Sequence, residues 1–288
     1  MRIQNFMEEG QIQDFWQKHP CGDGLIGGLD QAYQSDYAKF FDAYDKFRYD
    51  MESHIPATLD AIDFKDKRTL EIGLGQGADA EQITRRGAKY SGLDLTQEAV
   101  DRVKTRFQLR GLASEHIMQG SILDSPFSDA TFDIIFSHGV LHHVPDIKTA
   151  QKEIHRTLKP DGELIIMMYA KWSLNYLLSI CVLRRLGLLA AYAVNKRTGI
   201  IGEHVANAKK IGLVNYLKME NFIHRNTDGP HNPYAKVYDE ASLREDFPNF
   251  ELVKTYKRFM HAPPLPVHGW PGGSLMGWHL WAHLKPKH

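Results

Sequence analysis

The sequence predicts an α/β protein with a parallel sheet covered by helices on both faces. Two observations lead to this fold class. Short β-rich runs alternate with helical runs from residue 68 onward, and a glycine-rich loop joins the first strand to the first helix. Strands that alternate with helices are joined by crossovers, which place successive strands parallel in one sheet. The chain of 288 residues is long enough to bury a sizeable core as one large domain with an insertion.

The expected elements follow one another in a regular order. Strands are expected at 68–73, 89–95, 116–120, 132–137 and 163–169, and helices between them at 78–86, 96–111 and 146–159. Thr96 is placed to cap the second of these helices, and Gly111 is placed to end it. The run LKPDG at 158–162 predicts a Pro/Gly turn after the third helix.

After residue 169 the alternation lapses for roughly seventy residues, which predicts an insertion. The regular pattern then returns with a helix at 239–247 and strands at 251–260 and 277–285. The predicted organisation is an N-terminal helical cover (1–67), a core (68–170 and 239–288) and a lid or insertion (171–238). An insertion between late strands commonly covers a site, because binding groups concentrate on loops held by a rigid scaffold.

One segment of the insertion, 174–194, is apolar enough to suggest a membrane span. Arg184 and Arg185 divide it into two halves, each well short of the roughly 20 residues that cross a bilayer. We therefore expect a buried or lid helix and no integral membrane span. A helix on a membrane surface is less favoured because the two arginines are its clear cations and its polar face is narrow. A contact between two copies of the chain through 171–238 is the competing role.

The run TLEIGLGQGAD at 69–79 carries glycines at alternate positions, Gly73, Gly75 and Gly77. Such a turn lets the backbone approach a ligand closely and aims helix N–H groups at it. Glu71 and Asp79 flank the turn, and two carboxylates there repel the pyrophosphate of a dinucleotide and attract the ammonium or sulfonium of S-adenosylmethionine. The turn alone leaves a dinucleotide, S-adenosylmethionine and no ligand open, since Asp79 can simply cap a helix and Glu71 can satisfy backbone groups.

Two later strands also end in candidate site residues. Asp94 ends the second strand, where a carboxylate can bind the ribose hydroxyls of either cofactor. The fourth strand runs directly into a loop with His138, His142 and His143. In an open parallel sheet the loops at the carboxyl ends of the strands face the ligand crevice, so these histidines are favoured over the others as site residues.

The motifs LEIGLGQGAD, GLDLT, PFSDATFDIIFSHGVLHHVPD and LKPDGELIIM resemble, in order and spacing, the class I S-adenosylmethionine-dependent methyltransferases, over about residues 68–170. HPCG, FRYDMESHIP and TDGPHNPYAKVY also look like segments that recur in bacterial members that act on small molecules. The resemblance implies a Rossmann-like, doubly wound, mostly parallel seven-stranded sheet with an antiparallel last strand. It also implies S-adenosylmethionine as cofactor and S-adenosylhomocysteine as product.

The resemblance assigns the cofactor contacts to Glu71, Gly73, Leu74, Gly75, Gln76, Gly77, Asp94, Leu95, Ser121, Ile122, Ser137, His138 and Gly139. There is one departure from the family pattern. The family often has an aspartate directly after the third strand to bind the adenine amino group, and this chain has Ser121 there. Adenine is therefore expected to be held by Ser121, by the Ile122 backbone or by Asp124.

Methyl transfer by in-line displacement requires mainly alignment and desolvation. An acceptor hydroxyl, phenol, thiol or protonated amine also requires a base, and histidine suits that role near neutral pH. The candidate catalytic residues are His142, His143 and Tyr49. Tyr169, Trp172 and Tyr234 are the candidate acceptor-binding residues, and each of the six can instead serve only in packing.

The balance of charge excludes one class of partner. Lys+Arg and Asp+Glu both number 35 and no basic stripe is visible, so a small-molecule acceptor is expected and nucleic acid is not. Two cysteines without a CxxC motif and no visible signal peptide indicate a reducing, cytoplasmic compartment, and the scattered histidines predict no metal site. Two alternatives stay open: an NAD-dependent oxidoreductase, and a non-catalytic module that binds S-adenosylmethionine.

Overall fold

The computed structural model describes residues 2–287, with side chains from residue 9 onward. Its seven-stranded sheet has the order β3-β2-β1-β4-β5-β7-β6. The strands are β1 (Arg68–Ile72), β2 (Lys89–Asp94), β3 (His116–Gln119), β4 (Phe132–His138), β5 (Leu158–Tyr169), β6 (Phe250–Arg258) and β7 (His279–Pro286). Strands β1 to β5 are parallel, and β7 runs antiparallel to β5 and β6. The predicted sheet, with its antiparallel last strand, is confirmed.

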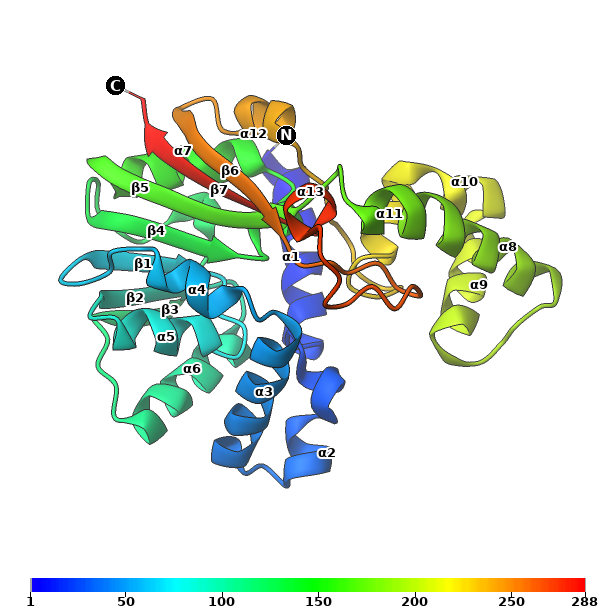
Figure 1. The fold of residues 1–288 in the computed structure, drawn as a ribbon, viewed down its shortest axis with the longest axis horizontal. Coiled ribbons are helices and arrows are strands. Elements are labelled where there is room, and N and C mark those ends of the chain that lie inside the picture. Colours follow the sequence, from blue (N-terminus) through cyan, green and yellow to red (C-terminus); the bar gives the residue numbers. More distant parts are fainter. Residues whose placement is uncertain (1, 288) are drawn as a thin grey trace.

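Helices cover both faces of this sheet (Figure 1). The helices of the core are α5 (Ala78–Arg85), α6 (Gln97–Arg110), α7 (Ile147–Thr157), α12 (Glu240–Asp246) and α13 (Gly273–Met276), with 3-10 turns η2 (Ile122–Asp124) and η3 (Leu141–His143). Helices α5 and α6 share one hydrophobic cluster, and α7 and α12 share another. Each face of the sheet therefore has its own core.

The apolar run of β5 shows why this strand is buried on both faces. Leu164, Ile166 and Met168 belong to the cluster under α7 and α12. Ile165 and Met167, which alternate with them, belong to the cluster under α5 and α6. A parallel strand covered by helices on both sides therefore reads as a continuous hydrophobic run.

The predicted helix signals have two outcomes. Thr96 accepts a hydrogen bond from the backbone of Ala99 and caps α6, and Gly111 ends this helix in the left-handed conformation with φ 62°. The turn predicted over 158–162 is wrong, because the structure extends β5 back to Leu158. The register between β4 and β5 shifts there, between Phe132 and Ile134, so the Pro/Gly segment is accommodated as an irregularity of the strand.

The N-terminal segment packs beside the sheet as the helices α1 (Arg2–Lys18), α2 (Leu29–Tyr33), α3 (Tyr37–Met51) and α4 (Ile55–Asp60), with a 3-10 turn η1 (Asp23–Ile26). Part of its aromatic stripe serves packing, because Phe40 and Phe41 are buried in one small cluster. Ion pairs fasten α3 to the core. The guanidinium of Arg106 on α6 is fully buried and pairs with Asp45 of α3 and, at 2.8 Å, with Glu81 of α5.

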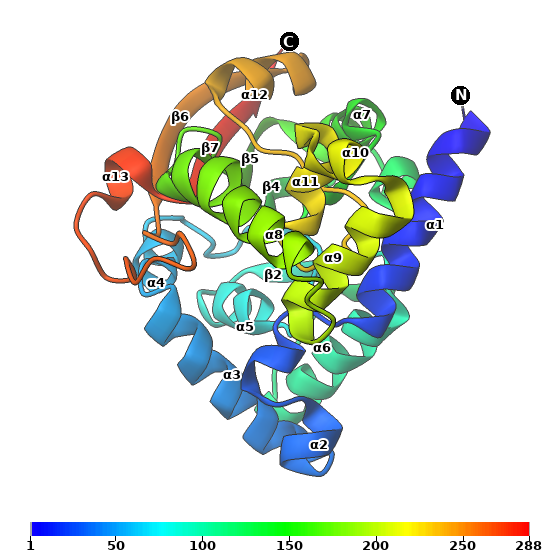
Figure 2. The same cartoon turned by 90° about the vertical axis from the view of Figure 1, so that its right-hand side faces the viewer.

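Residues 171–238 form a group of helices set apart from the sheet: the π-helix η4 (Asn175–Leu183), α8 (Arg184–Ala193), α9 (Gly199–Ile211), α10 (Leu213–Leu217) and α11 (Met219–Arg225). Figure 1 shows this insertion on the side toward which the parallel strands point, and Figure 2 views the same helices from the front. It has its own hydrophobic cluster, which includes Ile180, Leu188 and Phe222.

The apolar segment of the insertion forms one continuous helix, η4 and α8, from Asn175 to Ala193. Arg184 and Arg185 interrupt its apolar sequence but not the helix, because arginine is a good helix former. Both guanidiniums donate hydrogen bonds within the insertion, to the backbone oxygens of Asn226 and Leu217. The segment is not a buried helix, since 22% of its most apolar window is buried, and by length and composition alone it could cross a membrane.

Replacing Arg106 by methionine (R106M) is expected to lower the free energy of unfolding by about 3 kcal/mol, because removing one partner of a buried ion pair leaves its carboxylates uncompensated. Urea unfolding followed by circular dichroism measures the change. Arg86 provides the matched control, since its partner Asp60 is 68% exposed. We expect the R86M variant to lose less than about 1 kcal/mol. Equal losses in the two variants would show that the buried pairs do not hold the cover to the core.

Candidate functional site

A cavity opens at the carboxyl ends of β1, β2 and β4. The core contributes the glycine loop, the end of β2, the turn after β3 and the loop after β4 to its walls. The N-terminal segment supplies another wall with Glu9, Ile12, Trp16, Cys21, Tyr44 and Arg48. The cavity therefore lies between the sheet and the N-terminal helices.

The three glycines of the loop have different roles. A Cβ on Gly73, which has φ 80°, would lie 2.1 Å from a methyl carbon of Val140, so this position requires close backbone packing. Gly75 has φ 50°, and the nearest atom to a Cβ there would be Cys21 Cβ at 3.8 Å. Gly75 thus leaves open space on the cavity side, where a ligand can approach the backbone. Gly77 starts α5 and does not line the cavity.

A buried cluster of charges stands at the start of α5. Asp79 Oδ2 lies 2.7 Å from a guanidinium nitrogen of Arg48 and 2.7 Å from Nδ1 of His138. Burial opposes the ionisation of Asp79, but Arg48 and His138 outweigh it and hold the pKa of this carboxyl well below its usual value. Asp79 is therefore a carboxylate at neutral pH, and its charge is paired.

The second flanking carboxyl has a different state. Glu71 accepts a hydrogen bond of 2.5 Å from the hydroxyl of Tyr90. Burial, reinforced by the charge of Asp79, raises the pKa of Glu71 well above its usual value. The two carboxyls beside the loop therefore differ in state. Asp79 is an anion with a guanidinium partner, and Glu71 is shifted toward its neutral form because a buried charge requires compensation. Of the two groups that the sequence places there to attract a cation, Asp79 is the one that keeps its charge.

Two atoms of this cluster are nevertheless left for a ligand. Asp79 Oδ1 and Arg48 Nε are buried and have no hydrogen-bond partner among the described residues. Both residues line the cavity. Because buried polar groups are normally hydrogen-bonded, a carboxylate acceptor and a guanidinium donor side by side fit a zwitterion, such as the amino-acid end of S-adenosylmethionine.

Asp94 occupies the end of β2, as predicted. One of its oxygens accepts hydrogen bonds from the backbone and hydroxyl of Thr96, and the other accepts from the backbone of Leu74 at 2.6 Å. Burial raises the pKa of Asp94, although these hydrogen bonds oppose the change. The carboxylate, which lines the cavity together with Leu95, has the capacity to accept a ribose hydroxyl as well.

The structure places a carboxyl next to the position where the family often has an aspartate. Glu9 of α1 accepts a 2.5 Å hydrogen bond from the hydroxyl of Ser121. Glu9 lines the cavity, as do Gly120 and Ile122, whereas Ser121 and Asp124 do not. Burial raises the pKa of Glu9, and the hydrogen bond from Ser121 partly offsets it. The acid missing after β3 is thus present on a helix from the other end of the sequence.

His143 is the histidine of the β4 loop pair that lines the cavity. Its Nδ1 lies 2.7 Å from the backbone oxygen of Tyr234, so Nδ1 carries the proton in the neutral ring. Its Nε2 has no hydrogen-bond partner in the part of the chain that is described, and lies 3.4 Å from Asp228 Oδ2. The ring therefore presents an unprotonated nitrogen beside a carboxylate that can stabilise the imidazolium.

Other predicted residues lie outside the cavity wall. His142 is fully buried against Tyr169, with ring centroids 3.8 Å apart, and burial lowers its pKa well below the usual value. Tyr169 donates a hydrogen bond to Asp228, and Ser137 donates one to the backbone of Ile72. Tyr49 contacts the backbone of Ala78 at 3.4 Å.

The two remaining acceptor candidates are also placed elsewhere. Trp172 is 55% exposed, and its ring contacts the ammonium group of Lys171, 5.6 Å from the ring centroid. Tyr234 lines a separate pocket of the insertion, and its backbone oxygen lies 2.7 Å from Nδ1 of His143. Sequence reasoning missed Glu9, Trp16 and Arg48, whose nearest signal was the recurrence of the segments HPCG and FRYDMESHIP around 19–22 and 47–56.

Comparisons with known proteins agree with this geometry. A family model described as a methyltransferase domain matches residues 70–166. YrhH of Bacillus subtilis, a protein named as a methyltransferase, is 31% identical over 136 residues, which cover 46% of this chain and 73% of YrhH. A fatty-acid O-methyltransferase of Mycolicibacterium smegmatis is 33% identical over 108 residues, which cover 37% of this chain and 38% of that protein.

The crystal structure of an S-adenosylmethionine-dependent methyltransferase from Mesorhizobium loti shares the fold. Its TM-score is 0.54 at 15% identity, and the match covers 82% of this chain and 99% of that one. The chain spans only 38–40% of the length of the first curated relatives it matches. The sequence similarity is thus concentrated in the core that holds the glycine loop.

Replacing Gly75 by valine is expected to abolish binding of S-adenosylhomocysteine while the protein stays folded, because the side chain would fill the space that the ligand needs. Thermal melting with and without S-adenosylhomocysteine measures this, since a bound ligand raises the melting temperature. The G111V variant is the matched control for backbone strain, because Gly111 has φ 62° and open space around its Cβ position. Retained ligand stabilisation in the G75V variant would remove the loop from the site.

Proposed function

The chain belongs to the class I S-adenosylmethionine-dependent methyltransferases, and from this premise we propose that it methylates a hydroxyl group of a small, apolar acceptor. The single observation that carries the proposal is the placement of His143 in the cavity wall, with its Nδ1 held by the Tyr234 backbone oxygen and its Nε2 3.4 Å from Asp228 Oδ2. Methylation of a hydroxyl requires removal of its proton, whereas methylation of a carboxylate does not. A positioned, unprotonated imidazole nitrogen is the group that this step needs.

The cofactor end of the cavity supports the methyl donor. When bound, S-adenosylmethionine supplies a methyl group activated by the sulfonium. Arg48 is positioned to bind the carboxylate of its amino-acid end, and Asp79 Oδ1 to accept from its ammonium. Asp94 is placed for the ribose, and the glycine loop lets the backbone approach. These contacts would orient the donor and exclude water from it.

His143 would act as the general base. Its Nδ1–H is held by the backbone oxygen of Tyr234, which fixes the ring and leaves Nε2 to take the acceptor proton. Asp228 would stabilise the imidazolium that forms, and the hydroxyl of Tyr169 keeps Asp228 in place at 2.8 Å. Both Asp228 and the Tyr234 carbonyl belong to residues 171–238, so we propose that this insertion acts as a lid that completes the base.

The apolar character of the acceptor is inferred from the walls around His143. The rings of Trp16 and His143 pack edge-to-face, with their centroids 5.2 Å apart. Ile12, Val140 and Val144 line the same cavity. Similarity to a fatty-acid O-methyltransferase supports an acceptor with a hydrocarbon chain. A pocket with apolar walls and few polar groups recognises such a molecule by burial of its hydrocarbon surface.

We also propose that the carboxylate of Glu9 accepts a hydrogen bond from the amino group of adenine, in place of the aspartate that the family often carries. In the variant E9L, binding of S-adenosylhomocysteine is expected to weaken about tenfold or more, the scale of a hydrogen bond to a charged group. Calorimetry with the adenine and hypoxanthine forms of the ligand gives the specific test. Wild type should prefer adenine and E9L should lose the preference. An unchanged preference in E9L would assign Glu9 to fastening α1 alone.

Replacing His143 by glutamine is expected to lower kcat for a long-chain alcohol by about a hundredfold or more, the usual contribution of a general base. With a fatty acid of matched chain length as acceptor, kcat should change far less, because the carboxylate is already ionised. The rates are measured with S-adenosylmethionine carrying a labelled methyl group. The H143Q variant should bind S-adenosylhomocysteine as tightly as the wild type does.

His155 on α7 is half-buried against Phe250, away from the cavity wall, and supplies a control: the variant H155Q should keep full activity. Equal losses of kcat with the alcohol and the fatty acid would assign His143 to positioning and contradict the base. No methyl transfer by the wild type to either acceptor, together with intact binding of S-adenosylhomocysteine, would favour a different acceptor class or a non-catalytic binding module.

A further inference from the structure

We propose that the insertion docks on the surface of an anionic lipid bilayer through a tip formed by residues 194–201 and the outward face of α8. The tip is the connection between α8 and α9, at the outer end of the insertion in Figure 1 and in front of the sheet in Figure 2. This proposal goes beyond the proposed reaction and does not rest on it, because it concerns a surface outside the cavity.

The tip exposes large apolar side chains. Val194 is 76% exposed, Ile200 is 66% exposed and Ile201 is 54% exposed. On α8, the side chains of Leu186 and Leu189 are exposed as well. Side chains of this size clustered on one surface indicate an interaction site, because their contact with water is costly and no part of the described chain covers them.

The cations of the helix are turned away from this apolar face. Arg184 donates to Ser179 at 3.0 Å and to the backbone of Asn226. Arg185 donates to the backbone of Leu217 at 2.8 Å and lies over the ring of Phe222 at 5.3 Å. The two charges that interrupt the apolar sequence are thus used inside the insertion, and the outer face of the helix remains apolar.

A second set of cations lies in the tip and along the chain that follows it. Residues 194–218 contain five cations, all exposed, and one acid, Glu203, in a chain with 35 of each sign. Lys196 and Arg197 stand between Val194 and Ile200 in the tip itself. Apolar side chains flanked by lysine and arginine are the arrangement that binds an anionic membrane surface, where the apolar groups enter the headgroup region and the cations meet the lipid charges.

Charge and hydrogen bonding decide between a bilayer and the other occupants. A two-fold contact between two copies would bring the cations of the tip close to themselves, which is unfavourable. A helix that crossed the bilayer would have to give up the hydrogen bonds of Arg184 and Arg185 to the insertion. Docking on the surface keeps those bonds and uses both the apolar and the cationic side chains.

Vesicle sedimentation with the full-length protein tests the proposal. We expect binding to phosphatidylcholine vesicles that contain about a third phosphatidylglycerol, weak binding to pure phosphatidylcholine, and release by salt. Two double variants remove the two components, I200S/I201S and K196Q/R197Q. Each should weaken binding about tenfold, as expected for the loss of two side chains at a membrane surface.

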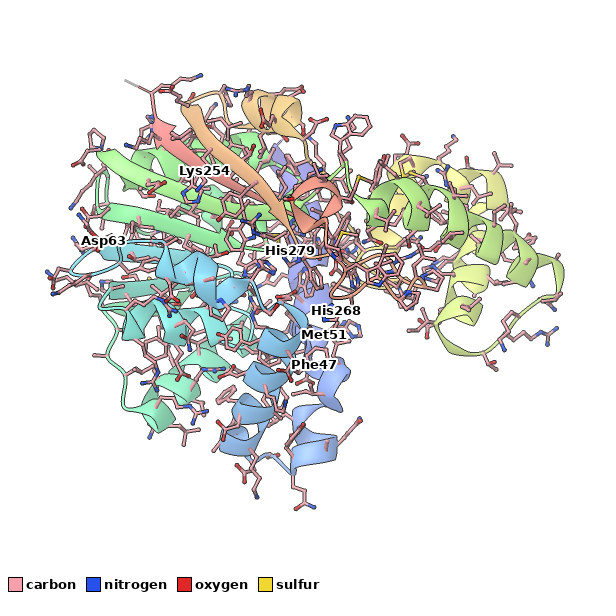
Figure 3. The ribbon with its side chains drawn as sticks, in the orientation of Figure 1. Phe47, Met51, Asp63, Lys254, His268 and His279 are labelled. Carbon is pink, nitrogen blue, oxygen red and sulfur yellow. The ribbon has the colours of Figure 1, made fainter. Side chains whose placement is uncertain are left out.

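The matched control is the double variant V253S/K254Q. Val253 is 55% exposed and is followed by the exposed Lys254, and Figure 3 places Lys254 over the sheet, away from the insertion. The control should bind vesicles as the wild type does. All variants should keep their stabilisation by S-adenosylhomocysteine, which shows that they are folded.

Three results would overturn the proposal. The first is equal binding to neutral and anionic vesicles, or equal losses in the control and the tip variants. The second is concentration-dependent dimerisation in analytical ultracentrifugation that the I200S/I201S variant abolishes, which would make the tip a contact between copies. The third is resistance of the bound protein to alkaline carbonate extraction, which would show that the helix crosses the bilayer.

Discussion

The burial of one carboxylate, Asp79, organises the parts of this protein around the cavity. A buried charge is tolerated only when it is paired, and the partners of Asp79 come from different parts of the fold. Arg48 reaches it from α3 of the N-terminal cover, and His138 reaches it from the end of β4. The pairing therefore ties the first helix of the core, the middle of the sheet and the cover together at the mouth of the glycine loop. Two atoms of the cluster, Asp79 Oδ1 and Arg48 Nε, are buried without a hydrogen-bond partner among the described residues, and both residues line the cavity.

The core was predictable because its signals are local. A buried parallel strand, a glycine turn and a capped helix each depend on residues within one short segment, so the sheet and the positions of Gly73, Gly75 and Asp94 follow from the sequence. The cavity wall contributed by α1 and α3 was not predictable in the same way. Arg48 and Glu9 meet the core through contacts between residues far apart in the chain, and although Arg48 lies in the segment FRYDMESHIP, that segment does not say what its arginine contacts. For the same reason the sequence ranks His142 and His143 equally, and only packing separates the buried ring from the one at the cavity.

The insertion shows how the same residue type can serve opposite purposes. Arginines within an apolar run argue against a membrane span when they are read as a linear pattern. In three dimensions Arg184 and Arg185 satisfy backbone oxygens of the insertion, so they stabilise the packing of the helix on its inner side. Lys196 and Arg197, only a few residues later, remain exposed. The direction of each side chain, rather than the sum of charges, decides what the surface presents.

The position of helix α1 bears on the turnover rate of the enzyme. It supplies Glu9, Ile12 and Trp16 to the cavity, and Gln13 fastens it to the end of β2 through the backbone oxygen of Leu95 at 2.8 Å. A ligand that fills the cavity would lie between α1 and the glycine loop, so a displacement of this helix would open a path for the spent cofactor. Exchange of cofactor would then limit how many cycles the enzyme completes each second, and the limiting segment would be one that touches no reacting bond. Substitutions that weaken or strengthen the packing of this single helix would then change the turnover rate without changing the chemical step.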